Sequence, residues 1–65
     1  MEYNTNYDYI KNNGSIYRVS KTDEILERYE SQTNIWEKVP QDLYVSIVYD
    51  SENSIDLNEE DIEKI

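Results

Sequence analysis

The chain has 65 residues, a formal net charge of −9, seven tyrosines and one tryptophan, and it contains neither cysteine nor histidine. A chain of this length forms one small domain, residues 1–65, which buries only about 60% of the surface that it exposes when unfolded. Without cysteine or histidine, disulfide scaffolds, thiolate zinc sites and the commonest general base are excluded, so we expect no enzyme and no cofactor.

The first part of the chain predicts two strands joined by a tight turn. Residues 3–10 alternate loosely between tyrosines and polar residues, which is typical of a frayed edge strand, with residues 1–6 as the part prone to fraying. Asn12-Asn13-Gly14 is a strong turn signal, because Asn and Gly tolerate positive φ. Residues 15–20 are rich in β-branched and aromatic side chains and predict the next strand.

Two further short segments continue this pattern. Residues 24–30 fit a strand or a helical turn, since Glu, Leu and Arg favour helices, but the short polar turns on both sides suit hairpins and favour the strand. Residues 35–39 predict another strand, which Pro40 ends. Segments at about ten-residue spacing, separated by turn residues, indicate an antiparallel meander.

Residues 41–49 are ambiguous between a helix and a strand. Pro40 and Asp42 suit the start of a helix, whereas two valines and an isoleucine suit a strand. Both conformations place apolar side chains on one face, and we favour a short helix.

The end of the chain predicts a second helix. Asn58 is the expected N-cap, three carboxylates follow in the first turn, and Leu57 and Ile62 form a hydrophobic staple. We expect Ile62 and Ile65 to face the sheet. The predicted fold is therefore α+β: a small antiparallel sheet of three to four strands, with a short C-terminal helix packed on one face.

The second half of the chain also shows a family resemblance. The residues concerned are Trp36, the Leu43-Tyr44 pair with Ile47, and the ending Ile55-Asp-Leu-Asn-Glu-Glu-Asp-Ile-Glu-Lys-Ile65. In these features the chain resembles short uncharacterised proteins of low-GC Gram-positive bacteria, which end in a helix after a short sheet that carries a tryptophan. The resemblance implies an α+β fold and no particular chemistry.

The acidic residues could serve either of two kinds of chemistry, hydrolysis or cation binding. A hydrolytic carboxylate pair needs a walled cleft, which a domain of this size hardly provides. Residues 50–61 place oxygen-bearing side chains at the spacing of a calcium loop, but Ile55 stands where glycine is needed and Asp61 where a bidentate glutamate is expected. An acidic loop leading into a capped helix is the better interpretation, with weak binding of divalent cations as the alternative.

The negative charge is concentrated in the last third of the chain. Residues 1–39 carry seven acidic and five basic side chains, whereas residues 40–65 carry eight acidic side chains and one basic side chain. Such a field disfavours direct contact with nucleic acid or anionic membranes and attracts basic partners. It indicates either a solubilising surface or a surface that fits a basic groove on another protein.

We therefore expect a small interaction module that binds a basic protein surface through tyrosines and the acidic segment 50–63. Tyrosine and tryptophan are favoured at protein interfaces, although Tyr17, Tyr29 and Trp36 also suit a small core. The distinct alternative is a phage-type inhibitor whose carboxylates imitate the phosphates of nucleic acid. The candidate partner-binding residues are Tyr3, Tyr7, Tyr9, Tyr49, Asp50, Glu52, Asp56, Glu59, Glu60, Asp61 and Glu63.

Location and self-association follow from the same composition. The chain shows no secretory signal and no apolar run long enough to span a bilayer, so we expect a cytoplasmic protein. Its wealth of Asn, Ile, Tyr and Lys indicates an AT-rich genome, such as that of a low-GC bacterium or phage. Charge repulsion predicts a monomer, with a weak dimer through an exposed strand edge favoured by salt or by low pH.

Overall fold

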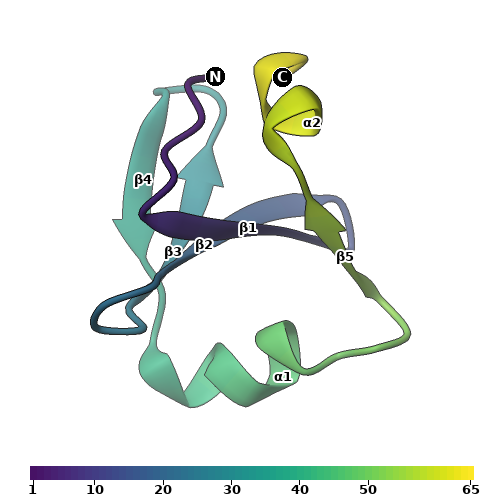
Figure 1. Cartoon of the computed structure of the whole chain (residues 1–65). Coiled ribbons are helices and arrows are strands. Elements are labelled where there is room, and N and C mark those ends of the chain that lie inside the picture. The colour runs from purple at the N-terminus through teal and green to yellow at the C-terminus, as the bar shows by residue number, and fades with distance from the viewer.

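The computed structural model describes all 65 residues as an α+β fold with one antiparallel five-stranded sheet (Figure 1). The strands are β1 (Tyr7–Asn12), β2 (Ser15–Ser20), β3 (Leu26–Glu30), β4 (Ile35–Lys38) and β5 (Ser54–Leu57). A 3₁₀ turn, η1 (Gln41–Leu43), runs into helix α1 (Tyr44–Val48), and helix α2 (Glu59–Glu63) follows β5. The α+β class and the antiparallel sheet are thus confirmed, but the sheet has five strands instead of three to four.

The extra strand changes the place of β1 in the sheet. The strand order is β4-β3-β2-β1-β5, so that the first four strands form the predicted meander and β5 returns to pair with β1. The pairing runs from Tyr9 opposite Leu57 to Asn12 opposite Ser54. The prediction of an edge strand at residues 3–10 is therefore wrong, because β1 lies inside the sheet. The sequence does not predict β5, because a segment of four residues that includes an aspartate carries a weak strand signal. In the sequence, residues 54–57 instead have the composition of an acidic loop.

Tight turns set the register of the meander. Asn13 and Gly14 join β1 to β2 with φ of 48° and 85°, as their chemistry predicts, and Asn12 lies opposite Ser15. Asn34 adopts φ of 58° in the turn between β3 and β4. Segment 26–30 is a strand, not a helical turn, which confirms the interpretation favoured by the flanking turns.

The main core lies between one face of the sheet and α1. Ile10, Val19 and Leu26 point from three adjacent strands towards Ile47 of α1, and all four are buried. In Figure 1, α1 crosses below the sheet and closes this face. The helix predicted over residues 41–49 is thus confirmed, as η1 followed by α1.

Helix α2 and the N-terminal residues lie on the opposite side of the sheet from α1 (Figure 1). The predicted cap is present: Asn58 Oδ1 accepts from the Asp61 backbone N–H at 2.9 Å, and Asp61 Oδ2 accepts from the Asn58 N–H at 3.1 Å. Ile62 is fully buried, as expected. Ile65 is exposed, contrary to the prediction, because it lies beyond the end of the helix, where its carbonyl accepts from the Met1 amino group at 2.7 Å.

Neither helix of the structure is long and apolar enough to cross a membrane.

Candidate functional site

A cluster of aromatic rings surrounds one arginine on the side of the sheet that faces α2. The Arg18 guanidinium carbon lies 4.0 Å from the centre of the Tyr7 ring and 4.4 Å from the centre of the Trp36 ring. Tyr9 and Tyr29 contact Trp36 with ring centres 5.9 Å and 5.1 Å away. We call these five residues the aromatic–arginine cluster. Cation–π contact of this kind favours a guanidinium over an ammonium group.

An ion pair holds the arginine in place. Arg18 Nε donates to Glu27 Oε1 at 2.8 Å, and both side chains are only 18% exposed. The two residues lie opposite each other on β2 and β3, so the sheet itself sets their spacing. With its charge balanced and both ring contacts satisfied, Arg18 acts as part of the packing of this face.

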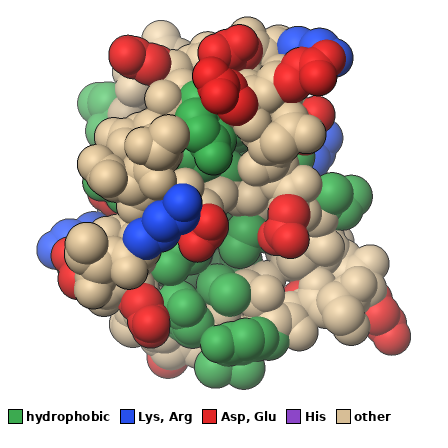
Figure 2. Space-filling view, viewed as in Figure 1, with side chains coloured by type: hydrophobic (Ala, Val, Ile, Leu, Met, Phe, Trp, Pro, Cys, Tyr) green, Lys and Arg blue, Asp and Glu red, His purple; other side chains and the backbone are tan.

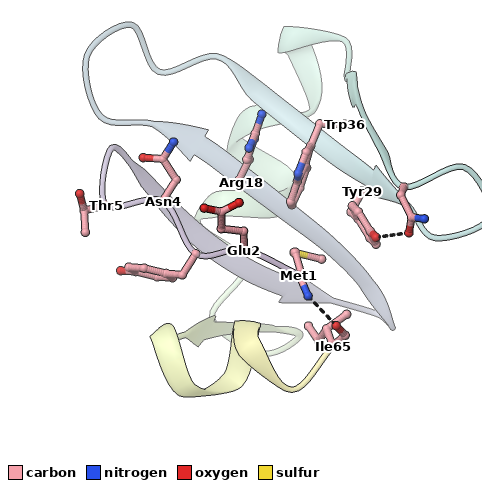
Figure 3. A pocket seen from close by; sticks show the side chains of 10 residues that line it. Met1, Glu2, Asn4, Thr5, Arg18, Tyr29, Trp36 and Ile65 are labelled. Carbon is pink, nitrogen blue, oxygen red and sulfur yellow. Dashed lines mark hydrogen bonds between the residues drawn. The ribbon is translucent and has the colours of Figure 1, made fainter.

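A hollow of about 790 Å³ opens above the cluster. In Figure 3, residues 1–5 run along one side of it, and the Arg18 and Trp36 side chains lie face to face on the sheet. Two hydrogen bonds close its border, one from Met1 to Ile65 and one of 2.6 Å from Tyr29 Oη to Asn34 Oδ1 (Figure 3). The hollow therefore lies between the chain's own terminal segments.

The outer side of α1 is apolar and uncovered. Val45 and Tyr49 are 65% and 70% exposed and lie four residues apart, which places them on one side of the helix turn. The exposed carboxylates of Asp42 and Glu52 come just before and just after this segment. We call these four residues the α1 surface.

A second hollow, of about 430 Å³, lies beside the α1 surface where β5 stops pairing with β1. Ile10 and Val19 of the sheet and Tyr44 and Val48 of the helix segment contribute to its apolar walls. Asp8 and Asp56, both exposed, lie at its border. We call this hollow the acid-rimmed slot.

Tyr44 experiences the negative charge at the slot. Burial, followed by the charges of Glu24, Tyr49 and Asp8, raises the pKa of the Tyr44 hydroxyl above its usual value. The Tyr44 and Tyr49 rings also meet edge to face, with centres 6.1 Å apart. The slot and the α1 surface are therefore neighbouring parts of one region.

Asp50 has a structural task in the turn before β5. Its carboxylate accepts hydrogen bonds from the backbone and side chain of Asn53, from the Glu52 N–H, and from the buried Asn12 side chain. The Asn53 side chain, more than the other donors, lowers the pKa of Asp50. Ser54 Oγ links the same turn to α1 by donating to the Ile47 carbonyl. The carboxylate thus accepts hydrogen bonds within its own turn and stabilises it.

The predicted partner-binding residues do not form one surface in the structure. Tyr49, Glu52 and Asp56 gather near α1 and the slot, whereas Glu59, Glu60 and Glu63 are exposed on α2 at the other side of the sheet. Asp61 is occupied by the capping box. Tyr3 and Tyr7 are half-buried in ring contacts with Tyr9.

Tyr9 corrects one sequence-based expectation. A partner-binding tyrosine is expected to be exposed, but only 2% of Tyr9 is accessible. Its hydroxyl accepts a hydrogen bond from the Asn4 backbone N–H at 3.0 Å. The reason is that the rings of Tyr3, Tyr7 and Trp36 pack around it on the face towards α2.

Sequence reasoning missed Val45, Tyr44 and Asp8 as parts of a surface. The helical alternative for residues 41–49 contained the signal for Val45, since Val45 and Tyr49 fall outside the apolar stripe that packs on the sheet. Asp8 had no such signal, because its neighbours in the slot come from β5 and α1.

Comparison with protein-family models, with curated proteins and with solved structures yields no match.

Proposed function

We propose that this chain is a small, non-catalytic interaction module that binds a basic protein surface through the α1 surface. The carrying observation is the exposure of Val45 and Tyr49 side by side on a helix whose opposite side fills the core. An apolar centre with a charged border is the usual anatomy of a protein interface, and tyrosine is favoured at its centre.

The charge around this surface supports a basic partner. Eight of the nine charged side chains in residues 40–65 are acidic, and the exposed Asp42 and Glu52 lie three residues before Val45 and three residues after Tyr49 in the chain. A field of one sign steers oppositely charged partners and raises the rate of encounter. In Figure 2, hydrophobic side chains gather over α1 at the bottom of the molecule, with acidic side chains nearby.

Imitation of nucleic acid receives less support from the arrangement of the charges. A mimic needs carboxylates in a row along one exposed face, at the spacing of phosphates. Figure 2 shows the acidic side chains in several separate places on this face, interrupted by hydrophobic and neutral groups. This distribution suits an interface with an apolar centre better than a phosphate imitation.

The test is capture of partners from the source cell by tagged chains. We expect the wild type to retain a partner at low salt, and the double variant V45S/Y49S to lose it. The matched control is Ile35→Ser, because Ile35 is an exposed apolar residue on β4, remote from α1. High salt should weaken the capture by screening the charges.

Two outcomes contradict the proposal. Equal capture by the wild type and V45S/Y49S shows that the α1 surface is not the contact. Capture restricted to enzymes that handle DNA or RNA, lost on adding nucleic acid, favours the mimic instead.

A further inference from the structure

We propose that the acid-rimmed slot binds an arginine side chain of the partner. This inference rests on the proposed function, because it names the group by which the module recognises a basic protein. It follows from the position of two carboxylates beside an apolar hollow, and from the Tyr44 ring that lines this hollow.

The Asp8 and Asp56 carboxylates lie on the same face of the sheet as the Ile10 side chain. Asp8 and Ile10 are two residues apart on β1, so their side chains share one face at a spacing of about 7 Å. Asp56 lies directly opposite Ile10 on β5, at about 5 Å across the ladder, and directly opposite residues also share a face. Ile10 points into the core beneath α1, so the two carboxylates flank the entrance to an apolar space.

The slot suits a side chain with an apolar stem and a charged tip. Seven of its nine lining residues are hydrophobic, and its volume is about 430 Å³. Figure 2 shows hydrophobic side chains in the middle of this face, above α1, between acidic ones. The methylene groups of an arginine would lie against Tyr44 and Val48, while its head stays at the rim.

Of the two rim carboxylates, only Asp8 has a cation partner. Asp8 lies 3.9 Å from Lys21, but both side chains are at least half exposed, and ion pairs of this kind contribute little. Asp56 has no ion-pair partner in the structure. Burial is the largest cause of the raised pKa of Tyr44, and the charges of Glu24, Tyr49 and Asp8 add to it.

Arginine fits better than lysine for two reasons. Its planar fork carries five N–H donors, which allows one guanidinium to serve carboxylates on two different strands. The Tyr44 ring in the lining adds a flat π surface, which guanidinium groups contact more often than ammonium groups do.

The test is an NMR titration of the isotope-labelled chain with N-acetyl-arginine amide, a probe whose charge is the guanidinium alone. We expect amide shifts confined to residues around the slot on β1, β5 and α1. N-acetyl-citrulline amide has the same shape without the charge and should cause no such shifts, and N-acetyl-lysine amide should bind more weakly.

Two isosteric variants on different strands sharpen the test. Asp56→Asn and Asp8→Asn should each weaken binding of the arginine probe roughly tenfold, the effect of losing one charge-assisted hydrogen bond. The matched control is Glu63→Gln, which removes the same charge from the exposed side of α2 and should leave the affinity unchanged. The spectrum of each variant shows whether the fold is kept, and two separate positions keep the test valid if one of them is not.

Several results would overturn the inference. Equal shifts with the citrulline probe, shifts spread over all acidic residues, or unchanged affinity in both aspartate variants each show that the slot does not recognise arginine. If the arginine probe fails while V45S/Y49S still abolishes capture, the slot is wrong and the interaction module stands. If the arginine probe binds but V45S/Y49S captures the partner as well as the wild type does, the proposed contact at the α1 surface is wrong instead.

Discussion

The two faces of the sheet are buried by different chemistry. The face that α1 covers is aliphatic, with Ile10, Val19 and Leu26 packed on Ile47. The face towards α2 carries the aromatic–arginine cluster and a half-buried ion pair. In Figure 1 the first is closed by one helix in mid-chain, whereas the second is bordered by the two ends of the chain.

This difference shows how a chain with few aliphatic residues covers two faces. Aliphatic burial is non-directional and scales with area, so it concentrates stability in a few well-packed side chains. Ring–ring and cation–π contacts contribute about 0.5–1.5 kcal/mol each, and they depend on geometry. The aliphatic face should therefore respond most strongly to truncation, and the aromatic face to loss of its charge balance.

The largest effect is expected at the centre of the aliphatic face. Leu26 is fully buried, and Leu26→Ala should lower the free energy of unfolding by about 2–5 kcal/mol, because it removes burial and leaves a cavity. Urea denaturation followed by Trp36 fluorescence measures this change. The control is Ile35→Ala on exposed β4, expected within about 0.5 kcal/mol of wild type. Similar losses in both variants would contradict the position of the core.

The second effect concerns the charge balance of the aromatic face. Arg18→Met should cost about 1–3 kcal/mol, because Glu27 then remains mostly buried without its partner. Adding Glu27→Gln should restore part of this loss, and the double-mutant cycle in urea denaturation measures the coupling. If the two single losses simply add, the pair is not an energetic unit.

A smaller effect is expected at the helix that borders this face. Asn58→Ala should destabilise the chain by about 1 kcal/mol, since it removes the side-chain acceptor of the capping box. The control is Glu63→Gln, which lies on the same helix and makes no contact with the cap. Asn53→Ala is unsuitable as a control because it disturbs the Asp50 turn. Thermal unfolding by circular dichroism compares Asn58→Ala with Glu63→Gln, and equal midpoints would contradict a working cap.

The smallest effect is the pH dependence of the Asp50 turn, which links β5 to the aliphatic face. The hydrogen bonds from Asn53 lower the pKa of Asp50, so its stabilisation is present above the ordinary pKa of about 4 and is lost as the pH falls through the lowered value. The stability difference between wild type and Asp50→Asn should stay constant above about pH 5 and shrink as the pH falls below about 4. A constant difference, as expected for Glu63→Gln at a remote position, would show that the charge of Asp50 does not matter.

Much of the candidate site depended on contacts that no local pattern carries. The exposure of Tyr49 and Glu52 could be predicted from their place in an acidic, polar-flanked segment. The burial of Tyr9 could not, because it depends on the rings of Tyr3, Tyr7 and Trp36 that pack around it on the face towards α2. Asp8 and Asp56 became neighbours through the pairing of β5 with β1 across more than forty residues.

The sequence by itself determined the features whose cause is local. The Asn13-Gly14 turn, the meander of β1 to β4 and the Asn58 cap follow from positive φ, β-branched composition and side-chain hydrogen bonds within a few residues. Only the tertiary structure decided that β1 is an interior strand, that its tyrosine is buried, and that the slot exists. Those features arise when distant segments pair. The backbone hydrogen bonds of a sheet form with any strand of suitable geometry, so the composition of the short β5 does not indicate its pairing with β1.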